Sequence, residues 1–329
     1  MSFNNLIGQE LLRKTLAGLL KDNRLSHAIL IAGPSGSGKQ AWGQALAMAI
    51  LCTESVSGES CTNCISCRQF ESKNHPEFFV LEPDGAKIKI DQVRSIRSRF
   101  HLAGGKKVCL IKQAEAMTAE ASSSLLKILE EPPEGLHFIL LSEQPGQLFD
   151  TILSRCQRYF LHPLKQEEII HLLTCNKSMN REKAAILARM SRGVPGRAYE
   201  LAEDETFDLR REAAENLAIS LMSGDESAYH LLDKAHSLAD REDLSAFLEL
   251  LCYAFRDGLM MHYCRDDRLL IDPNRPSLHE IDLEISSLEA AVCLINDTSY
   301  ELNSTNVNRR LLLEKMLIMI QRRFNQCLK

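Results

Sequence analysis

The first half of the chain combines short apolar runs with segments whose apolar residues recur at helical spacing. Apolar runs without polar alternation are typical of strands buried in a parallel sheet. These runs predict strands at 28–31, 75–81, 108–111 and 137–141. Apolar residues three or four apart predict helices at 9–21, 91–100 and 121–131. Strands that alternate with helices in this way indicate an α/β fold with a parallel sheet.

The second half of the chain lacks strand patterns. After His162-Pro163, residues 164–208 show short helical patterns with a break at Gly193-Val194-Pro195-Gly196, and longer helical patterns follow from 209 to 329. A loop is expected near Asp272-Pro273-Asn274-Arg275-Pro276. Two apolar stripes should pack in the last region, namely Leu244, Phe247, Leu248, Leu251, Phe255 and Leu259, and Leu312, Met316, Leu317 and Ile320. The pattern therefore predicts three domains, at 1–163, 164–208 and 209–329.

Composition and charge narrow the class of protein. A chain of 329 residues can bury a substantial core, and its net charge of −5 argues against coating nucleic acid by bulk electrostatics. No apolar run approaches the roughly 20 residues needed to span a bilayer, and the first residues lack the features of a signal peptide. Seven of the eleven cysteines are scattered singly among apolar residues. This usage fits a protein of the reducing cytoplasm.

A candidate phosphate-binding loop follows the first predicted strand. The segment Gly33-Pro34-Ser35-Gly36-Ser37-Gly38-Lys39-Gln40 comes after the run at 28–31 and opens a helical pattern. In such a P-loop, backbone N–H groups and the helix N-terminus cradle phosphates, and the lysine reaches the terminal ones. The candidate nucleotide-binding residues of the loop are Gly33, Gly36, Gly38, Lys39 and Gln40.

The positions that should hold Mg²⁺ carry unsuitable residues. The residue after the P-loop lysine should be Ser or Thr, because that hydroxyl ligates the metal, and Gln40 offers only a neutral amide. The strand at 108–111 should end in acidic residues, but Lys112-Gln113 follows it, and a lysine repels the ion. Glu115 lies past the strand end and is interpreted as a solvated residue at a helix start. The loop is therefore predicted to hold phosphate without hydrolysing ATP.

The remaining cysteines form a cluster, Cys52, Cys61, Cys64 and Cys67, with the spacing C-x8-C-x2-C-x2-C. Two abutting C-x2-C turns let thiolates converge on one tetrahedral ion, and the longer loop returns the fourth from a helix end. Four thiolates without an open position predict a structural zinc site. An iron–sulfur cluster and a group of reduced or redox-active thiols are the alternatives.

Further segments complete a specific order and spacing along the chain. They are Ile7-Gly8-Gln9-Glu10, Leu25-Ser26-His27-Ala28, Asn74-His75-Pro76, Ile90-Asp91-Gln92-Val93-Arg94, Leu125-Leu126-Lys127-Ile128-Leu129-Glu130-Glu131-Pro132-Pro133, Thr151-Ile152-Leu153-Ser154-Arg155-Cys156-Gln157, and Asn306-Val307-Asn308-Arg309-Arg310-Leu311 with Leu313-Glu314. Together with the P-loop and the cysteine insert, they resemble the delta-prime subunit family of the bacterial DNA polymerase III clamp loader, within the AAA+ superfamily. The resemblance is dense over 3–163, looser over 164–208 and weak through the middle of the last domain.

The resemblance implies a three-part architecture. An AAA+ α/β core at 1–163, with its zinc insert at 52–67, would be followed by a small helical lid and an all-α C-terminal collar. In such loaders the subunits form an open ring through their collars. ATP bound by the gamma/tau motor subunits drives opening of the sliding clamp and its placement on primer-template DNA, with the delta subunit as a further neighbour. A delta-prime-like subunit is implied to be a non-hydrolysing member of that ring.

The resemblance also assigns a role to Arg155, the arginine of Ser154-Arg155-Cys156. It implies an arginine finger that projects into the adjacent motor subunit's ATP site, where a guanidinium neutralises charge on the γ-phosphoryl oxygens. Without the surrounding pattern, an ordinary surface salt bridge would be the interpretation. Ser154 and Cys156 are expected to position the turn.

The two sensor positions of the family fall on residues of this chain as well. The first falls at Ser142 or Glu143, where an inward-pointing acid would oppose a phosphate and an outward-pointing one would be solvated. Arg197 matches the second sensor, in the lid, with a surface arginine at a helix start as the alternative. Together with the P-loop residues, Arg197 could retain ATP or ADP without turnover.

Three arginines on the predicted helix at 91–100 are candidates for contacts to DNA phosphates. Arg94 and Arg97 lie three residues apart, with Arg99 close by, and a solvated basic face is the alternative. Two other functions remain open. One is an active AAA+ ATPase, which the unsuitable metal-binding positions disfavour. The other is a nucleic-acid binder that uses the cysteine cluster as a zinc finger, which the few basic residues beside it, Arg68 and Lys73, disfavour.

Overall fold

The computed structural model describes residues 2–100, 105–224, 226–264, 269–272, 284–304 and 307–327. The chain folds into two compact units, residues 1–200 and 201–329. The predicted domain boundaries at residues 163 and 208 stay predictions. The predicted loop residues 273–276 and the matching residue Asn306 lie outside the described residues.

The first unit is built on a five-stranded sheet in the order β2-β3-β4-β1-β5, in which every neighbouring pair is parallel. Its strands are β1 (Ala28–Ala32), β2 (Phe78–Leu81), β3 (Lys107–Ile111), β4 (Leu136–Ser142) and β5 (Gln157–Phe160). The register of the central pair places Ile29 beside Ile139. The four strands predicted from the sequence are confirmed within a few residues. The parallel sheet confirms the predicted α/β class.

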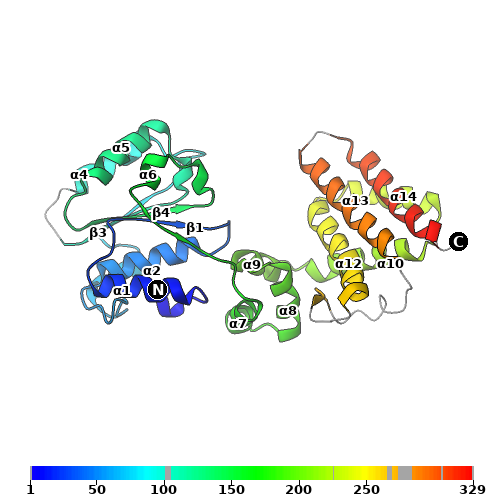
Figure 1. Cartoon of the computed structure of the whole chain (residues 1–329), viewed down its shortest axis with the longest axis horizontal. Helices are drawn as coiled ribbons and strands as arrows, with labels where there is room; N and C mark the ends of the chain where they lie inside the picture. Colours follow the sequence, from blue (N-terminus) through cyan, green and yellow to red (C-terminus); the bar gives the residue numbers. More distant parts are fainter. Residues whose placement is uncertain are drawn as a thin grey trace. The chain divides into compact units, whose positions relative to one another are not determined.

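Helices cover both faces of this sheet, as Figure 1 shows. Alternate side chains of β1 enter two different cores: Ile29 and Ile31 pack on one face, and Leu30 packs on the other. The helices of the unit up to residue 160 are α1 (Glu10–Lys21), α2 (Lys39–Leu51), α3 (Ile65–Glu71), α4 (Ile90–Phe100), α5 (Ala119–Glu130) and α6 (Asp150–Leu153), with short 3-10 turns at Phe3–Asn5, Ala114–Ala116 and Pro145–Gln147. Leu16 of α1 and Trp42 of α2 belong to the first core, whereas α4, α5 and α6 contribute to the second. Burial on both faces explains why the central strands are apolar at every position.

Strand β5 and helix α6 were not predicted. The strand lies at the edge of the sheet, and its residues Gln157, Arg158 and Phe160 are exposed. An edge strand that buries little shows no apolar run, so the pattern that revealed the other four strands is missing here.

Three short helices complete the first unit: α7 (Gln166–Lys177), α8 (Arg181–Met190) and α9 (Pro195–Glu203), whose last residues cross the unit boundary at residue 200. The predicted break at 193–196 is confirmed in its position. Gly193 has a φ of 78°, and Pro195 opens α9, because the fixed φ of proline suits the first turn of a helix.

In the part of the second unit that the structure describes, the chain is helical. Its helices are α10 (Phe207–Ser223), α11 (Ala228–Ala239), α12 (Leu244–Cys264), α13 (Ile285–Ser304) and α14 (Arg309–Cys327). The predicted stripe on α12 is buried throughout. On α14, Met316, Leu317 and Ile320 are buried, but Leu313 takes the buried place expected for Leu312. Among the described residues, no helix has the length and apolar character that a membrane crossing requires.

Candidate functional site

The P-loop lies at the carboxyl end of β1 and leads directly into α2. Gly36 and Gly38 have φ values of 71° and 88°, a region of backbone conformation that favours glycine. The N–H of Gly33 donates to the carbonyl of Ser142 at 3.2 Å, which fixes the loop beside β4. The loop forms one wall of a cavity of about 750 Å³. The predicted strand–loop–helix unit is therefore present, with open space in front of it.

The start of α9 forms another wall of the cavity. From α9, Gly196 donates its N–H to the carbonyl of Gly36 at 2.8 Å, and Tyr199 also lines the space. A Cβ atom on Gly196 would come within 2.6 Å of the Gly36 Cα, so this approach requires glycine. Arg197, the predicted second-sensor residue, is half-buried in α9, but the cavity-lining residues that the structure describes do not include it.

The P-loop lysine is already paired inside the chain. Lys39 is the first residue of α2, and its side chain is only 10% exposed. Its ammonium donates to the carbonyl of Pro34 at 2.7 Å and lies 3.3 Å from Oε1 of Glu143. Glu143 is the residue after β4, so the inward direction considered for this acid is the one observed. A carboxylate thus lies at the group that would otherwise contact phosphate.

The metal-binding positions do not fit Mg²⁺. Gln40 and Lys112 both line the cavity, and the Lys112 ammonium donates to Oε2 of Glu82 at 2.8 Å. Of the described lining residues, Glu82 and Glu143 are the acids, and each is paired with a lysine. Magnesium requires hard oxygen ligands in near-octahedral geometry. The expected hydroxyl ligand is replaced by the Gln40 amide, and the two carboxylates of the lining are neutralised by lysines.

The interpretation of Glu115 as a solvated residue is wrong. Its Oε1 accepts a hydrogen bond from the backbone N–H of Glu143 at 2.9 Å, and its Oε2 is buried without a hydrogen-bond partner among the described residues. The hydroxyl of Ser142, the other candidate for the first sensor, is likewise buried without a described partner. Glu115 therefore supports the turn that carries Glu143, because the two segments meet where β3 and β4 end.

Sequence reasoning missed Glu82, which follows the end of β2. It could have been predicted to line the site from its place directly after a strand, since ligands of open parallel sheets bind at the carboxyl ends of the strands. Tyr199 was missed as well, and no motif in the sequence points to it. Its place in the cavity follows from the packing of α9 against the P-loop.

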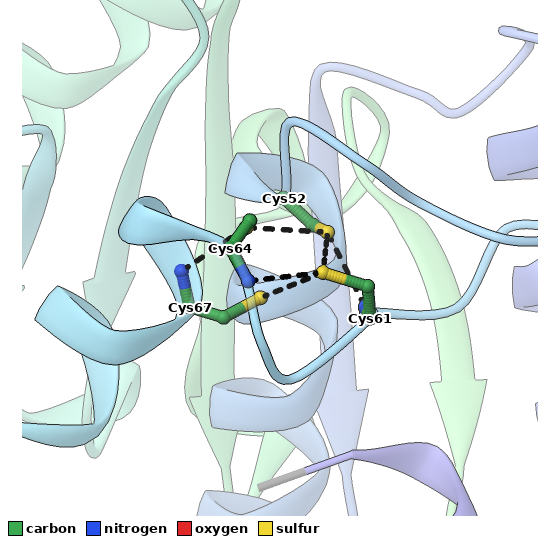
Figure 2. A group of neighbouring side chains, drawn as sticks. All are labelled: Cys52, Cys61, Cys64 and Cys67. Carbon is green, nitrogen blue, oxygen red and sulfur yellow. Dashed lines mark hydrogen bonds between the residues drawn. The ribbon is translucent and has the colours of Figure 1, made fainter.

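The four cysteines converge, as Figure 2 shows. Their sulfurs all lie within 4.8 Å of one another, and three of the separations are 3.6 Å (Cys52–Cys61), 3.9 Å (Cys52–Cys64) and 4.0 Å (Cys61–Cys67). An ion bound tetrahedrally at about 2.3 Å from each sulfur would separate the sulfurs by about 3.8 Å. The cluster could therefore hold a metal ion.

Backbone geometry prepares these sulfurs for negative charge. The N–H groups of Cys61, Cys64 and Cys67 donate to the sulfurs of Cys52, Cys61 and Cys64 at 3.3, 3.3 and 3.4 Å. Burial raises the pKa of Cys64, but hydrogen bonds from Thr53 and from the Cys67 N–H outweigh it and lower that pKa to about 5. Burial and the neighbouring thiols Cys64 and Cys52 raise the pKa of Cys67. Four thiolates this close repel one another, and a bound dication would relieve that repulsion.

The cysteine insert is attached to the rest of the core. Cys52 directly follows α2, and Cys64 caps α3. The buried hydroxyl of Ser66 donates to the carbonyl of Leu51 at 2.7 Å and lies 2.9 Å from Nε2 of His75. The cluster therefore links the end of the P-loop helix to the segment that enters β2.

Arg155 lies in the turn between α6 and β5. Its Nη2 donates to Oε1 of Glu130 at 2.7 Å, its Nη1 donates to the carbonyl of Thr151 at 2.9 Å, and its side chain is 35% exposed. Burial raises the pKa of the Cys156 thiol to about 11, so this group stays neutral. The Ser154 hydroxyl donates to the Thr151 carbonyl at 3.1 Å. These contacts agree with the expectation that Ser154 and Cys156 position the turn.

The three arginines of α4 are exposed, but their side chains have different surroundings. Arg94 lies 3.9 Å from the carboxylate of Asp91. The guanidinium of Arg99 lies over the ring of Phe79, 4.7 Å from its centre, so this side chain packs on β2. Arg94 and Arg97 are therefore the better candidates for a phosphate contact.

A parallel sheet in this strand order, with a P-loop after β1 and helices on both faces, gives the first unit a P-loop NTPase fold, as is expected of an AAA+ core. The family model described as DNA polymerase III, delta subunit, matches residues 8–165. The delta' subunit of DNA polymerase III from Bacillus subtilis is 31% identical over 94% of this chain and 94% of that relative. The Escherichia coli delta' subunit is 30% identical over 90% of this chain and 89% of its own length. The chain belongs to the family of DNA polymerase III delta' subunits.

Other matches also carry the names of DNA polymerase III subunits. The tau subunit of DNA polymerase III from Bacillus subtilis is 29% identical over 72% of this chain and 38% of that relative. The solved structure of a gamma subunit-related protein from Thermotoga maritima covers 94% of this chain and 99% of that chain, with 19% identity and a TM-score of 0.41.

Proposed function

We propose that this chain is a non-hydrolysing subunit of a bacterial clamp loader, which helps to place the sliding clamp on primer-template DNA during replication in the cytoplasm. Its neighbours in the ring would be motor subunits of the gamma/tau type and a delta subunit, bound through the helical second unit. Membership of the delta' family supports this assignment.

The observation that carries the non-hydrolysing part is the pairing of Lys112 with Glu82 inside the nucleotide cavity. In a working P-loop ATPase, Mg²⁺ bridges the phosphates and acidic residues hold it. Here a lysine stands at the end of β3, and Gln40 replaces the hydroxyl ligand. ATP or ADP could reach the P-loop only without the metal that turnover requires.

Arg155 would act in the neighbouring subunit instead. Its side chain is partly exposed, and its guanidinium makes hydrogen bonds to Glu130 and to Thr151 that limit its rotamers. An arginine that is ordered before assembly loses less side-chain entropy when it meets a phosphate. Fingers of this kind are worth roughly 10³–10⁵ in rate.

The cysteine cluster would hold a structural Zn²⁺. Its four sulfur ligands leave no open position for a substrate, which is the arrangement of structural sites. Arg94 and Arg97 would contribute at most local contacts to the DNA backbone, because the chain as a whole is acidic.

Reconstitution with motor subunits, clamp and primed DNA tests this function. Arg155→Ala should lower ATP turnover by roughly 10³-fold or more at the one motor site that Arg155 faces. The other sites keep their fingers, so the total DNA-stimulated turnover should fall by that site's share. Clamp loading should fall with it. Assembly of the ring, measured by size-exclusion chromatography, should be unchanged.

Arg158→Ala is the matched control, since this exposed arginine lies three residues away on β5. It removes the same charge from the same region and should leave turnover and loading at the native level. Native rates of turnover and loading with Arg155→Ala would show that Arg155 does not act as an arginine finger.

A further inference from the structure

Glu143 occupies the place of a ligand in the nucleotide cavity. The lysine of a P-loop has three N–H donors, which in a loaded site point at phosphate oxygens. In this chain one donor goes to the Pro34 carbonyl at 2.7 Å, and a carboxylate oxygen of Glu143 lies 3.3 Å from the same nitrogen. The anion that faces Lys39 is therefore a side chain of the protein.

The surroundings strengthen this pairing. The Lys39 side chain is 10% exposed and that of Glu143 is 36% exposed, so water screens their attraction less than it screens a surface pair. Glu143 is also held in place through its backbone, because its N–H donates to Glu115. A buried lysine requires a partner, and the protein supplies one from the adjacent strand.

Lys112, the second lysine of the cavity, is also paired with a carboxylate. Lys112 and Lys39 both line the space, and the Lys112 ammonium is 2.8 Å from Glu82. An incoming polyphosphate would meet two lysines that are already neutralised and two carboxylates that repel it. If those carboxylates were absent, the two ammonium groups could bind phosphate oxygens without a divalent metal.

We propose that Glu143 is a built-in substitute for phosphate, which keeps nucleotides out of a cavity that could otherwise bind them without Mg²⁺. The ligand class of the opened cavity is a nucleoside diphosphate or triphosphate, with Lys39 and the P-loop N–H groups on its phosphates. Lys112 provides the positive charge that Mg²⁺ provides in a motor subunit. The inference depends on the cavity alone and not on Arg155.

Glu143→Gln tests this inference, because it removes the charge and keeps the size of the side chain. ADP binding to the full chain should be measured by isothermal titration calorimetry, once with Mg²⁺ and once with EDTA. We expect at least a tenfold gain in affinity for ADP over the native chain, with the same gain in EDTA. The double variant Glu143→Gln with Lys39→Met should lose the gain, because the released cation is then missing.

Glu167→Gln is the matched control, since Glu167 forms a pair with Arg181 on the exposed surface of the first unit, 3.2 Å apart. It should bind ADP as the native chain does. Thermal unfolding of each variant shows whether it is folded. A folded Glu143→Gln chain with native affinity, or a gain that requires Mg²⁺, would overturn the inference.

The test of Glu143 can fail or succeed independently of the test of Arg155. Arg155→Ala is measured by clamp loading, whereas Glu143→Gln is measured by ADP binding to the chain alone, so the two tests share no readout. If Arg155→Ala had no effect while Glu143→Gln gained affinity, the finger would be lost and the internal anion would stand. The reverse pair of results would remove the internal anion and leave the finger.

Discussion

The cysteine cluster and the P-loop cavity lie in the same unit and have opposite relations to their expected ligands. In the cluster, four sulfurs of the right type converge at distances suited to a tetrahedral ion, and backbone N–H groups support their charge. In the cavity, the loop has the right backbone, but the charges that a ligand would meet are already neutralised by Glu82 and Glu143.

A binding motif can provide ligands, as the cysteine cluster does, or it can serve only as a packed backbone segment, as the P-loop does. The cluster could hold a metal ion, and in an insert with few apolar residues of its own such an ion would contribute to its order. The P-loop retains its shape because β1, α2 and α9 pack around it, and its chemistry is not needed for that packing. Packing can therefore maintain the backbone of a P-loop even where side chains of the protein neutralise its charge.

Removal of the metal should have the largest effect on stability. A structural metal contributes on the order of 10 kcal/mol to the folding of a small site, so Cys64→Ser should lower the free energy of unfolding of the first unit by several kcal/mol. Denaturant unfolding, followed together with metal content, measures both. Acidification should release the metal from the native chain, because protons compete for the thiolates.

Cys175→Ser serves as the control for that change, because Cys175 is an exposed thiol on α7. It should retain both the metal and the stability of the native chain. If Cys64→Ser lost no stability, or if the purified native chain carried no metal, the contrast between the two regions would disappear.

A smaller effect is expected at Gly36, where the P-loop touches the segment that opens α9. Gly36→Ala places a side chain at a φ of 71°, with its Cβ 3.1 Å from Val194 and 3.2 Å from Gly196. We expect a loss of about 1–2 kcal/mol in the absence of any nucleotide. Thermal unfolding of the full chain without ligand provides the measurement.

Gly18→Ala gives the opposite sign and is the natural comparison. Gly18 lies within α1, and among the described residues no atom beyond its chain neighbours and the backbone of its own helix lies within 4 Å of the Cβ it would gain. Alanine should stabilise that helix by about 0.5–1 kcal/mol. Equal stability of the native and Gly36→Ala chains would mean that packing does not maintain the loop.

The sequence was sufficient for those parts of the site that depend on local spacing. The four cysteines and the P-loop lie where their motifs predict, because each motif folds within a single strand–loop–helix segment or a single insert. The helical stripe on α12 was likewise predictable, since periodicity and burial follow from the same geometry.

The contacts between distant segments could not be predicted. The pairing of Lys112 with Glu82 depends on β2 and β3 being neighbours, and the direction of Glu143 depends on the support from Glu115. The sequence around Glu115 indicates a solvated residue, because nothing in it shows that β4 ends beside this position. Charge pairs across a parallel sheet are properties of strand order, which a motif does not contain.

The proposal that this chain does not hydrolyse ATP is tested by the rate of phosphate release from the purified chain alone, in ATP and Mg²⁺ at saturating concentrations. We expect no turnover above the background of the matched Lys39→Met variant, because Gln40 and Lys112 stand where Mg²⁺ requires a hydroxyl and a carboxylate. Steady turnover by the native chain at the rates of motor ATPases, abolished by Lys39→Met, would contradict it.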